Sequence, residues 1–187
     1  MKVSEKAVIA ATIKWLERIV IGLNFCPFAK PIYTKKQIRF VVSCACKSDA
    51  LLNELKEELS LIVATASEKI ESTLLIHPDV LNNFVDYNSF LAVCDLAVEE
   101  LGLDGILQIA SFHPQYRFAD TPDDDVTNCT NRSPYPMLHL LRESSVTRAI
   151  ESYPDANKIY ERNIELLNRL GKEKVDAIWT DLMQGET

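Results

Sequence analysis

Apolar residues recur along this chain at the spacing of helices in some segments and of strands in others. Between Val8 and Leu23 they return every three or four positions, which predicts a helix that ends near Gly22 and Pro27. Gly102 suits the end of a later helix. The same spacing predicts helices over residues 8–23, 48–66, 84–101, 136–152, 155–170 and 175–182.

Three short segments have the composition of strands. Residues 37–46 are rich in β-branched and aromatic side chains, and residues 72–76 and 105–112 form apolar runs. A predicted helix lies between each pair, and connections of that length favour parallel pairing. We therefore predict an α/β (or α+β) fold. It would be a single domain over residues 1–187 with a small, mainly parallel sheet flanked by helices, and with helical N- and C-terminal ends.

Composition narrows the class of partner. The chain has 187 residues, of which 47% are hydrophobic, so it can bury one core. Its net charge of -7 and the absence of any basic run argue against nucleic acid, and no apolar run is long enough to span a membrane. The five cysteines are an odd number without a C-x-x-C pair, which argues against a disulfide framework. We expect a cytoplasmic protein, whose oligomeric state the sequence leaves open.

Two of the three histidines directly follow a predicted strand and precede a proline: His77-Pro78 and His113-Pro114. If both strands are parallel, these histidines leave the same end of the sheet, where ligands bind in open α/β sheets. We predict that His77 and His113 act there as acid–base groups. The alternative is that His-Pro simply ends each strand, because proline cannot continue the ladder. Both readings stay open.

A long segment without periodicity, residues 113–133, follows the second histidine. Such loops are often functional, and its aromatic residues predict that it packs against the domain. It carries Asn131 and Arg132, which we predict to bind an anionic ligand together with Arg142. It also carries Asp124 and Asp125. With His77 and His113 these could bind a divalent metal ion, although no known metal motif is present and the cofactor is otherwise unknown.

The predicted helix that begins at Pro136 would extend this site. On a helix, His139, Arg142 and Glu143 would share one face, which adds His139 to the ligand-binding residues. Arg132 would lie at the start of that helix, where unpaired N–H groups favour anions. In the alternative, Arg132 pairs with an aspartate and Arg142 with a glutamate, and neither binds a ligand.

Several longer stretches resemble a bacterial family known as domain of unknown function 1415. They are WLERIVIGLNFCPFAKP, TLLIHPDVLNNFVDYNSFL, QIASFHPQYRFAD and TNRSPYPMLHLLRESS, and the resemblance covers nearly the whole chain, from about Trp15 to Gly171. The resemblance implies a bacterial cytoplasmic protein whose whole chain forms one domain. It implies no reaction, cofactor or catalytic residue.

From the residues we predict an enzyme that acts on a small polar or anionic metabolite. The alternative is a non-catalytic ligand-binding or assembly protein that uses the same cleft. The first requires His77 and His113 within reach of one pocket, and an assembly protein requires an exposed apolar patch.

Overall fold

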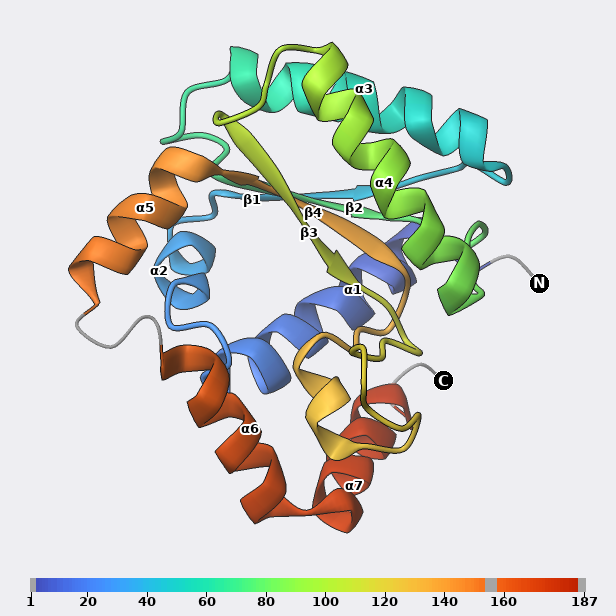
Figure 1. The fold of residues 1–187 in the computed structure, drawn as a ribbon, viewed down its shortest axis with the longest axis vertical. Coiled ribbons are helices and arrows are strands. Elements are labelled where there is room, and N and C mark those ends of the chain that lie inside the picture. Colours follow the sequence, from blue (N-terminus) through green and yellow to red (C-terminus); the bar gives the residue numbers. More distant parts are fainter. Residues whose placement is uncertain (1–2, 154–157, 185–187) are drawn as a thin grey trace.

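The computed structural model describes residues 3–153 and 158–184 (Figure 1). The chain begins with a long helix whose second half is wound as a π-helix, and it ends with a pair of helices. In chain order the elements are α1 Glu5–Trp15, η1 Leu16–Ile21, α2 Ala29–Thr34, β1 Ile38–Val42, α3 Ser48–Ala64, β2 Ser72–Ile76, α4 Phe84–Glu100, β3 Leu107–Phe112, η2 Val126–Thr130, β4 Met137–Arg142, α5 Glu143–Ser152, α6 Ile159–Leu170 and α7 Lys172–Met183. The start of the helix predicted over residues 155–170 lies outside the described residues.

The strands form one four-stranded sheet in the order β1-β2-β4-β3. β1 pairs with β2 in parallel, whereas β4 lies between β2 and β3 and is antiparallel to both. The α/β class is confirmed. The prediction of a mainly parallel sheet is wrong: the sheet is mixed, because a strand that the sequence pattern did not predict occupies a central position.

That strand is β4, in the segment predicted to be helical from Pro136. Leucine, methionine and arginine are good helix formers, and a short apolar run does not distinguish a buried strand from a buried helix. The segment forms a strand because it pairs with β2 on one side and with β3 on the other. The helix begins only at Glu143 as α5, and the Pro136 carbonyl instead accepts a hydrogen bond from the His77 N–H.

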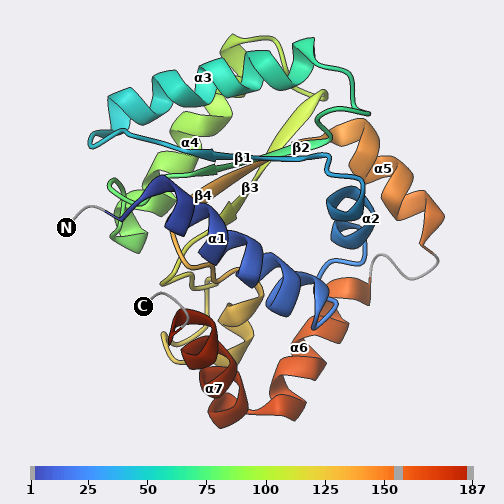
Figure 2. The same cartoon turned by 180° about the vertical axis from the view of Figure 1, so that it is seen from behind.

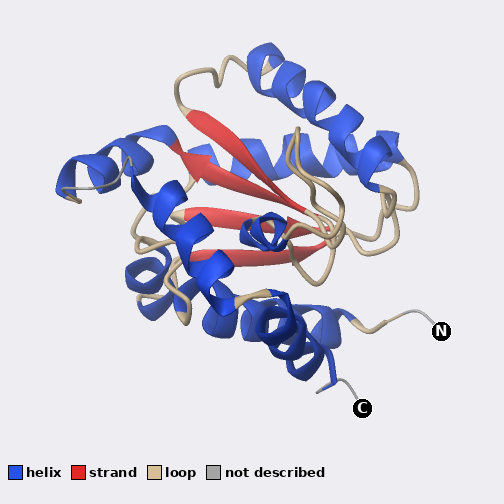
Figure 3. Ribbon diagram, turned by 60° about the horizontal axis from the view of Figure 1, so that its bottom comes forward, coloured by secondary structure: helices blue, strands red, loops and turns tan. Residues whose placement is uncertain are grey.

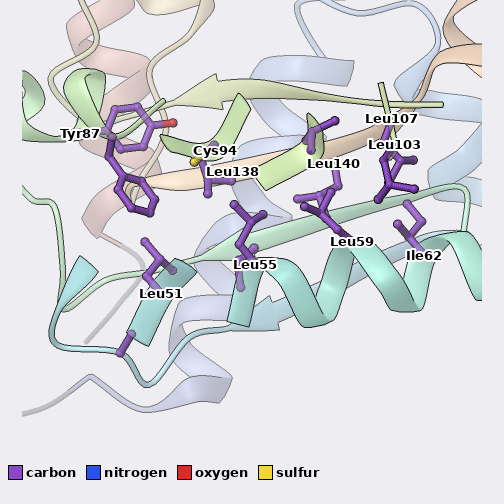
Figure 4. Close-up of a cluster of buried hydrophobic side chains, with 14 of the residues drawn as sticks. Leu51, Leu55, Leu59, Ile62, Tyr87, Cys94, Leu103, Leu107, Leu138 and Leu140 are labelled. Atoms are coloured by element: carbon purple, nitrogen blue, oxygen red, sulfur yellow. The ribbon is translucent and has the colours of Figure 1, made fainter. Parts of the chain in front are cut away.

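Helices cover both faces of the sheet (Figures 1 and 2). α3 and α4 pack on one face, and Figure 4 shows Leu51, Leu55 and Leu59 of α3 directed toward Leu138 and Leu140 of β4. α1, η1, α6 and α7 form the second core on the other face. Among the described helices, none has the length and apolar character that crossing a lipid bilayer requires.

The π-helical end of the first helix leaves no room for a Cβ atom at Gly22. Its backbone is helical, yet a Cβ atom at this position would lie 2.4 Å from the Arg18 carbonyl oxygen. Gly22→Ala should therefore destabilise the protein by about 1–2 kcal/mol, as overpacking does, although alanine usually favours a helix. Urea unfolding would measure this. Asn53→Ala, at an exposed position of α3, is the control and should be neutral or slightly stabilising; a stabilised Gly22→Ala would contradict the clash.

Candidate functional site

Both His-Pro steps lie at the same end of the sheet. β2 and β3 are each antiparallel to β4, so they run in the same direction, as predicted, although they are not neighbours. His77 and His113 therefore follow the carboxyl ends of their strands, where Figure 3 shows loops gathered. Their rings flank Tyr87 of α4, with ring centroids 5.8 Å and 5.0 Å from it. We call this place the carboxyl end of the sheet.

His113 is fully buried, and both of its ring nitrogens are hydrogen-bonded. Its Nδ1 accepts a bond from the Gln115 N–H at 3.0 Å, so the proton must be on Nε2, which donates to the Leu81 carbonyl at 3.2 Å. Burial lowers the pKa of this histidine. His113 is therefore a neutral ring that ties the end of β3 to the segment before α4.

His77 is also fully buried. Its Nδ1 donates to the Val80 carbonyl at 2.9 Å, and its Nε2 has no hydrogen-bond partner among the described residues. Burial, only partly offset by the bond to Val80, lowers the pKa of His77 to about 4. The ring is neutral at pH 7 and is not exposed to a substrate in solution.

Tyr87, between these rings, connects two strands through its hydroxyl. The O–H donates to the Met137 carbonyl at 2.8 Å and accepts from the Phe112 N–H at 3.0 Å. The helical pattern of α4 predicted only that this side chain is buried. The bridging role depends on β4, which the pattern did not reveal.

Removal of that hydroxyl should weaken the carboxyl end of the sheet. Tyr87→Phe removes the partner of a part-buried N–H and of a buried carbonyl, so we expect a loss of about 1–2 kcal/mol. Thermal or urea unfolding would measure it. Tyr160→Phe, at a residue that is 55% exposed, is the control and should change stability by less than about 0.5 kcal/mol. Equal stability of both variants would contradict the bridge.

The segment 113–133 packs against the domain through its aromatic rings, as predicted. Tyr116 contacts Phe84 of α4 with centroids 5.2 Å apart, and Phe118 contacts Tyr160 of α6 at 6.1 Å. Asn128, buried within the segment, receives bonds from the Phe118 N–H and the Thr121 hydroxyl. These contacts fix the segment at the carboxyl end of the sheet.

Asn131 lies at this end but contacts the backbone of the protein itself. Its Nδ2 donates to the Ser111 carbonyl at 3.2 Å, and its own carbonyl accepts from the His113 N–H. The side chain thus extends the hydrogen bonding of β3. The contact favours a structural role for Asn131 over the predicted role in ligand binding.

The predicted metal ligands are not assembled into a set. Asp124 is exposed, and Asp125 caps the short helix η2 by accepting bonds from the Thr127 N–H and hydroxyl. Those bonds lower the pKa of Asp125. Within residues 3–153 and 158–184, no group of three histidine, cysteine, aspartate or glutamate side chains is arranged to hold a metal ion. This arrangement does not favour the predicted metal site with His77, His113, Asp124 and Asp125.

Arg132 and Arg142 are separated, which corrects the predicted shared anion site. β4 leads away from the carboxyl end, so Arg142 lies opposite Leu107 at the start of β3. Its guanidinium donates to three carbonyls around the end of α3, those of Ile62, Thr65 and Ile70. Arg142 thus caps α3 at the far end of the sheet from the histidines.

His139 also lies in β4 rather than on a helix. It pairs with Leu74 and Ala110 in the middle of the sheet, and strand alternation places its side chain on the face opposite to that of Arg142. The predicted stripe with Arg142 and Glu143 is therefore wrong. The Nε2 atom of His139 is buried without a partner among the described residues, and burial lowers its pKa to about 4.

Arg132 lines a cleft at the carboxyl end of the sheet. The cleft has a volume of about 460 Å³ and lies between the start of α4 and the segment 113–133. It is lined by Asn83, Phe84, Val85, Pro114, Gln115, Arg117, Asp123 and Arg132. Neither His77 nor His113 is among these residues, although Pro114 and Gln115 directly follow His113.

Contacts within the protein position both arginines of the cleft. The Arg132 carbonyl accepts a bond from the Trp15 indole at 2.9 Å, and its Nη2 donates to the Asp123 carbonyl at 2.6 Å. Arg117 forms an ion pair with the Asp123 carboxylate at 2.6 Å. The sequence analysis did not select Arg117; its place three residues after the second His-Pro step is the signal that marks it.

One family model matches residues 7–177 of the chain, with the description "protein of unknown function (DUF1415)". No curated protein and no solved structure matches the chain. The match extends over β1 to β4 and includes both His-Pro steps. The chain belongs to the DUF1415 family of proteins of unknown function.

Proposed function

We propose that this protein binds a small anionic ligand in the cleft between the start of α4 and the segment 113–133. One observation carries the proposal: two guanidinium groups, of Arg117 and Arg132, line the same cleft of about 460 Å³. That volume lies within the range of small-molecule sites. Guanidinium groups bind carboxylates and phosphates through charged hydrogen bonds of fixed geometry.

The arginines, rather than the helix, supply the positive charge. The side-chain oxygen of Asn83 accepts bonds from the Val85 and Asp86 N–H groups and so occupies donors at the start of α4. Asp86 in the first turn adds a negative charge. The partial charge of the helix start is therefore largely compensated, and an anion here depends on Arg117 and Arg132.

Ligand binding without acid–base chemistry by the histidines agrees best with this geometry. His77 and His113 are buried and outside the cleft lining, and burial lowers the pKa of both. They would support the cleft indirectly, since His113 bonds to the backbone of Gln115. We also propose that this protein acts in the cytoplasm, as the sequence predicts.

Arg117→Ala tests the proposal more cleanly than Arg132→Ala. Arg132 also donates to the Tyr116 and Asp123 carbonyls, so its loss would disturb the segment itself. Arg117 has a 48% exposed side chain and an exposed aspartate as partner. Arg18 is a matched control, because its side chain is 49% exposed and is paired with Asp181 on α7, away from the cleft.

Thermal unfolding with inorganic phosphate, sulfate and citrate gives the readout. At an anion concentration about 100 times its dissociation constant, a ligand stabilises by about 2.7 kcal/mol, which raises the melting temperature by several degrees. We expect this rise in the native protein and in Arg18→Ala, and its loss in Arg117→Ala. An equal response of all three proteins would overturn the proposal, and so would the lack of any response to these anions and to acetate, hexanoate and benzoate.

A further inference from the structure

We propose that the ligand is a carboxylate with an apolar body, and that its carboxylate takes the place of Asp123 on Arg117. This inference rests on the proposed function and names the class of ligand for the same cleft. It follows from three features of the lining: an apolar side, a rigid aromatic wall, and an internal carboxylate that already occupies one arginine.

The cleft has an apolar side as well as a cationic one. Phe84, Val85 and Pro114 line it together with the two arginines. Val85 is 66% exposed, although it is an apolar residue in the first turn of a helix, where polar residues are common. A ligand that consists of charge alone, such as inorganic phosphate, would leave this apolar surface in water. A ligand with an apolar group would cover it.

Phe84 is held in place by other aromatic rings. Its centroid lies 5.2 Å from that of Tyr116 and 5.4 Å from that of His113, in tilted arrangements that aromatic pairs favour. His113 is itself fixed by hydrogen bonds on both ring nitrogens. The ring of Phe84 is therefore a preorganised wall, against which a flat or branched apolar group can pack without a cost for ordering the protein.

Asp123 shows what kind of group Arg117 binds. Its carboxylate contacts Nη1 of Arg117, while its backbone carbonyl accepts from Nη2 of Arg132. The Asp123 side chain is 86% exposed, and exposed ion pairs contribute little. The side chain can therefore leave Arg117 while the backbone stays bound to Arg132. A ligand carboxylate that pairs with the guanidinium through two parallel bonds would replace it.

If a ligand carboxylate replaces that of Asp123 on Arg117, removal of the Asp123 carboxylate should strengthen ligand binding. Asp123→Asn frees Arg117 and keeps the backbone bond to Arg132. Asp124→Asn is the matched control, because it removes the same charge from the next residue, which is exposed and does not line the cleft. Measurement at about 0.1 M salt screens the long-range effect that the loss of one negative charge has on anion binding.

Heteronuclear NMR titrations with acetate, hexanoate, benzoate and inorganic phosphate test the inference. We expect benzoate and hexanoate to bind about tenfold more tightly than acetate, as burial of two or more apolar carbons implies. Asp123→Asn should tighten benzoate binding about two- to fivefold, which corresponds to an exposed ion pair, and Asp124→Asn should not. The perturbed amides should include those of Val85 and Gln115.

Val85→Thr separates the apolar contribution from the charge. The two side chains have the same shape, and the exposure of Val85 makes a folding defect unexpected. The variant should weaken hexanoate and benzoate binding by a larger factor than acetate binding, because acetate has the smallest apolar group to place against this side chain.

The failures of the two proposals are distinguishable. If no anion or carboxylate binds the native protein, or if Arg117→Ala binds as well as the native protein, the proposed function itself fails. If phosphate binds as tightly as benzoate and Asp123→Asn has no effect, the cleft is an anion site of another class and only this inference is overturned.

Discussion

Lowering the pH from 7 to 5 should reduce the free energy of unfolding by about 4 kcal/mol, roughly 2 kcal/mol from each of two buried histidines. Burial lowers the pKa of both His77 and His139 to about 4, from an ordinary value of 6.5. Between these values the unfolded chain binds protons that the folded chain does not. Stability therefore falls as the pH falls through this window, which begins above the range in which most carboxylates titrate.

Urea unfolding at pH 7, 6 and 5 measures how the free energy of unfolding depends on pH. The variant His139→Leu separates the contribution of His139 from that of His77. Leucine replaces a buried nitrogen that has no partner among the described residues with an apolar group, so we expect the variant to be at least as stable at pH 7. Its loss of stability at pH 5 should be about half that of the native protein. Parallel curves for the two proteins would show that His139 does not titrate between the folded and unfolded states.

Arg142→Leu should destabilise the protein by about 2–4 kcal/mol, because one half-buried guanidinium donates hydrogen bonds to several carbonyls at once. Nη2 donates to the Thr65 carbonyl at 2.6 Å and to the Ile70 carbonyl at 3.0 Å, and also reaches that of Ile62. The carbonyls at the end of a helix lack partners within it. Without Arg142, the end of α3 would lose the contact that joins it to β4.

Arg148→Leu is the matched control for this effect. Arg148 lines the same cleft of about 660 Å³ as Arg142, but its side chain is 66% exposed and its ion pair with Glu71 spans 3.7 Å. We expect a change below about 1 kcal/mol. Arg142→Lys should fall between the native protein and Arg142→Leu, because an ammonium group cannot reproduce the planar set of donors. If Arg142→Leu and Arg148→Leu are equally stable, the capping role is excluded.

The same arginine shows where prediction from the sequence failed. The apolar run around Leu138 and Leu140 fits a helix as well as a strand, and its residue types favour the helix. The chain forms a strand because β2 and β3 leave a place between them that β4 fills with hydrogen bonds on both sides. Because this segment is a strand, Arg142 lies at the far end of the sheet and His139 is not part of the expected ligand site.

The structure confirms one part of the prediction, the placement of both His-Pro steps at the same end of the sheet. The two His-Pro steps end strands that run in the same direction, and the cleft begins at the residue after His113. Which side chains face the cleft was not predictable from the pattern. His113 turns inward to accept a bond from the Gln115 N–H, whereas Arg117, four residues further on, lines the cleft.

The sequence by itself determined the elements whose pattern is long and regular: the helices around α1, α3 and α4, and the strands β1 to β3 between them. Their apolar spacing is a local property, and it follows from the periods of helix and strand. Only the tertiary structure decided the conformation of β4, the burial of both histidines and the pairing of Arg117 with Asp123. Each of these depends on contacts between residues that the local pattern does not relate, because hydrogen bonds across the sheet and the exclusion of water are properties of the assembled fold.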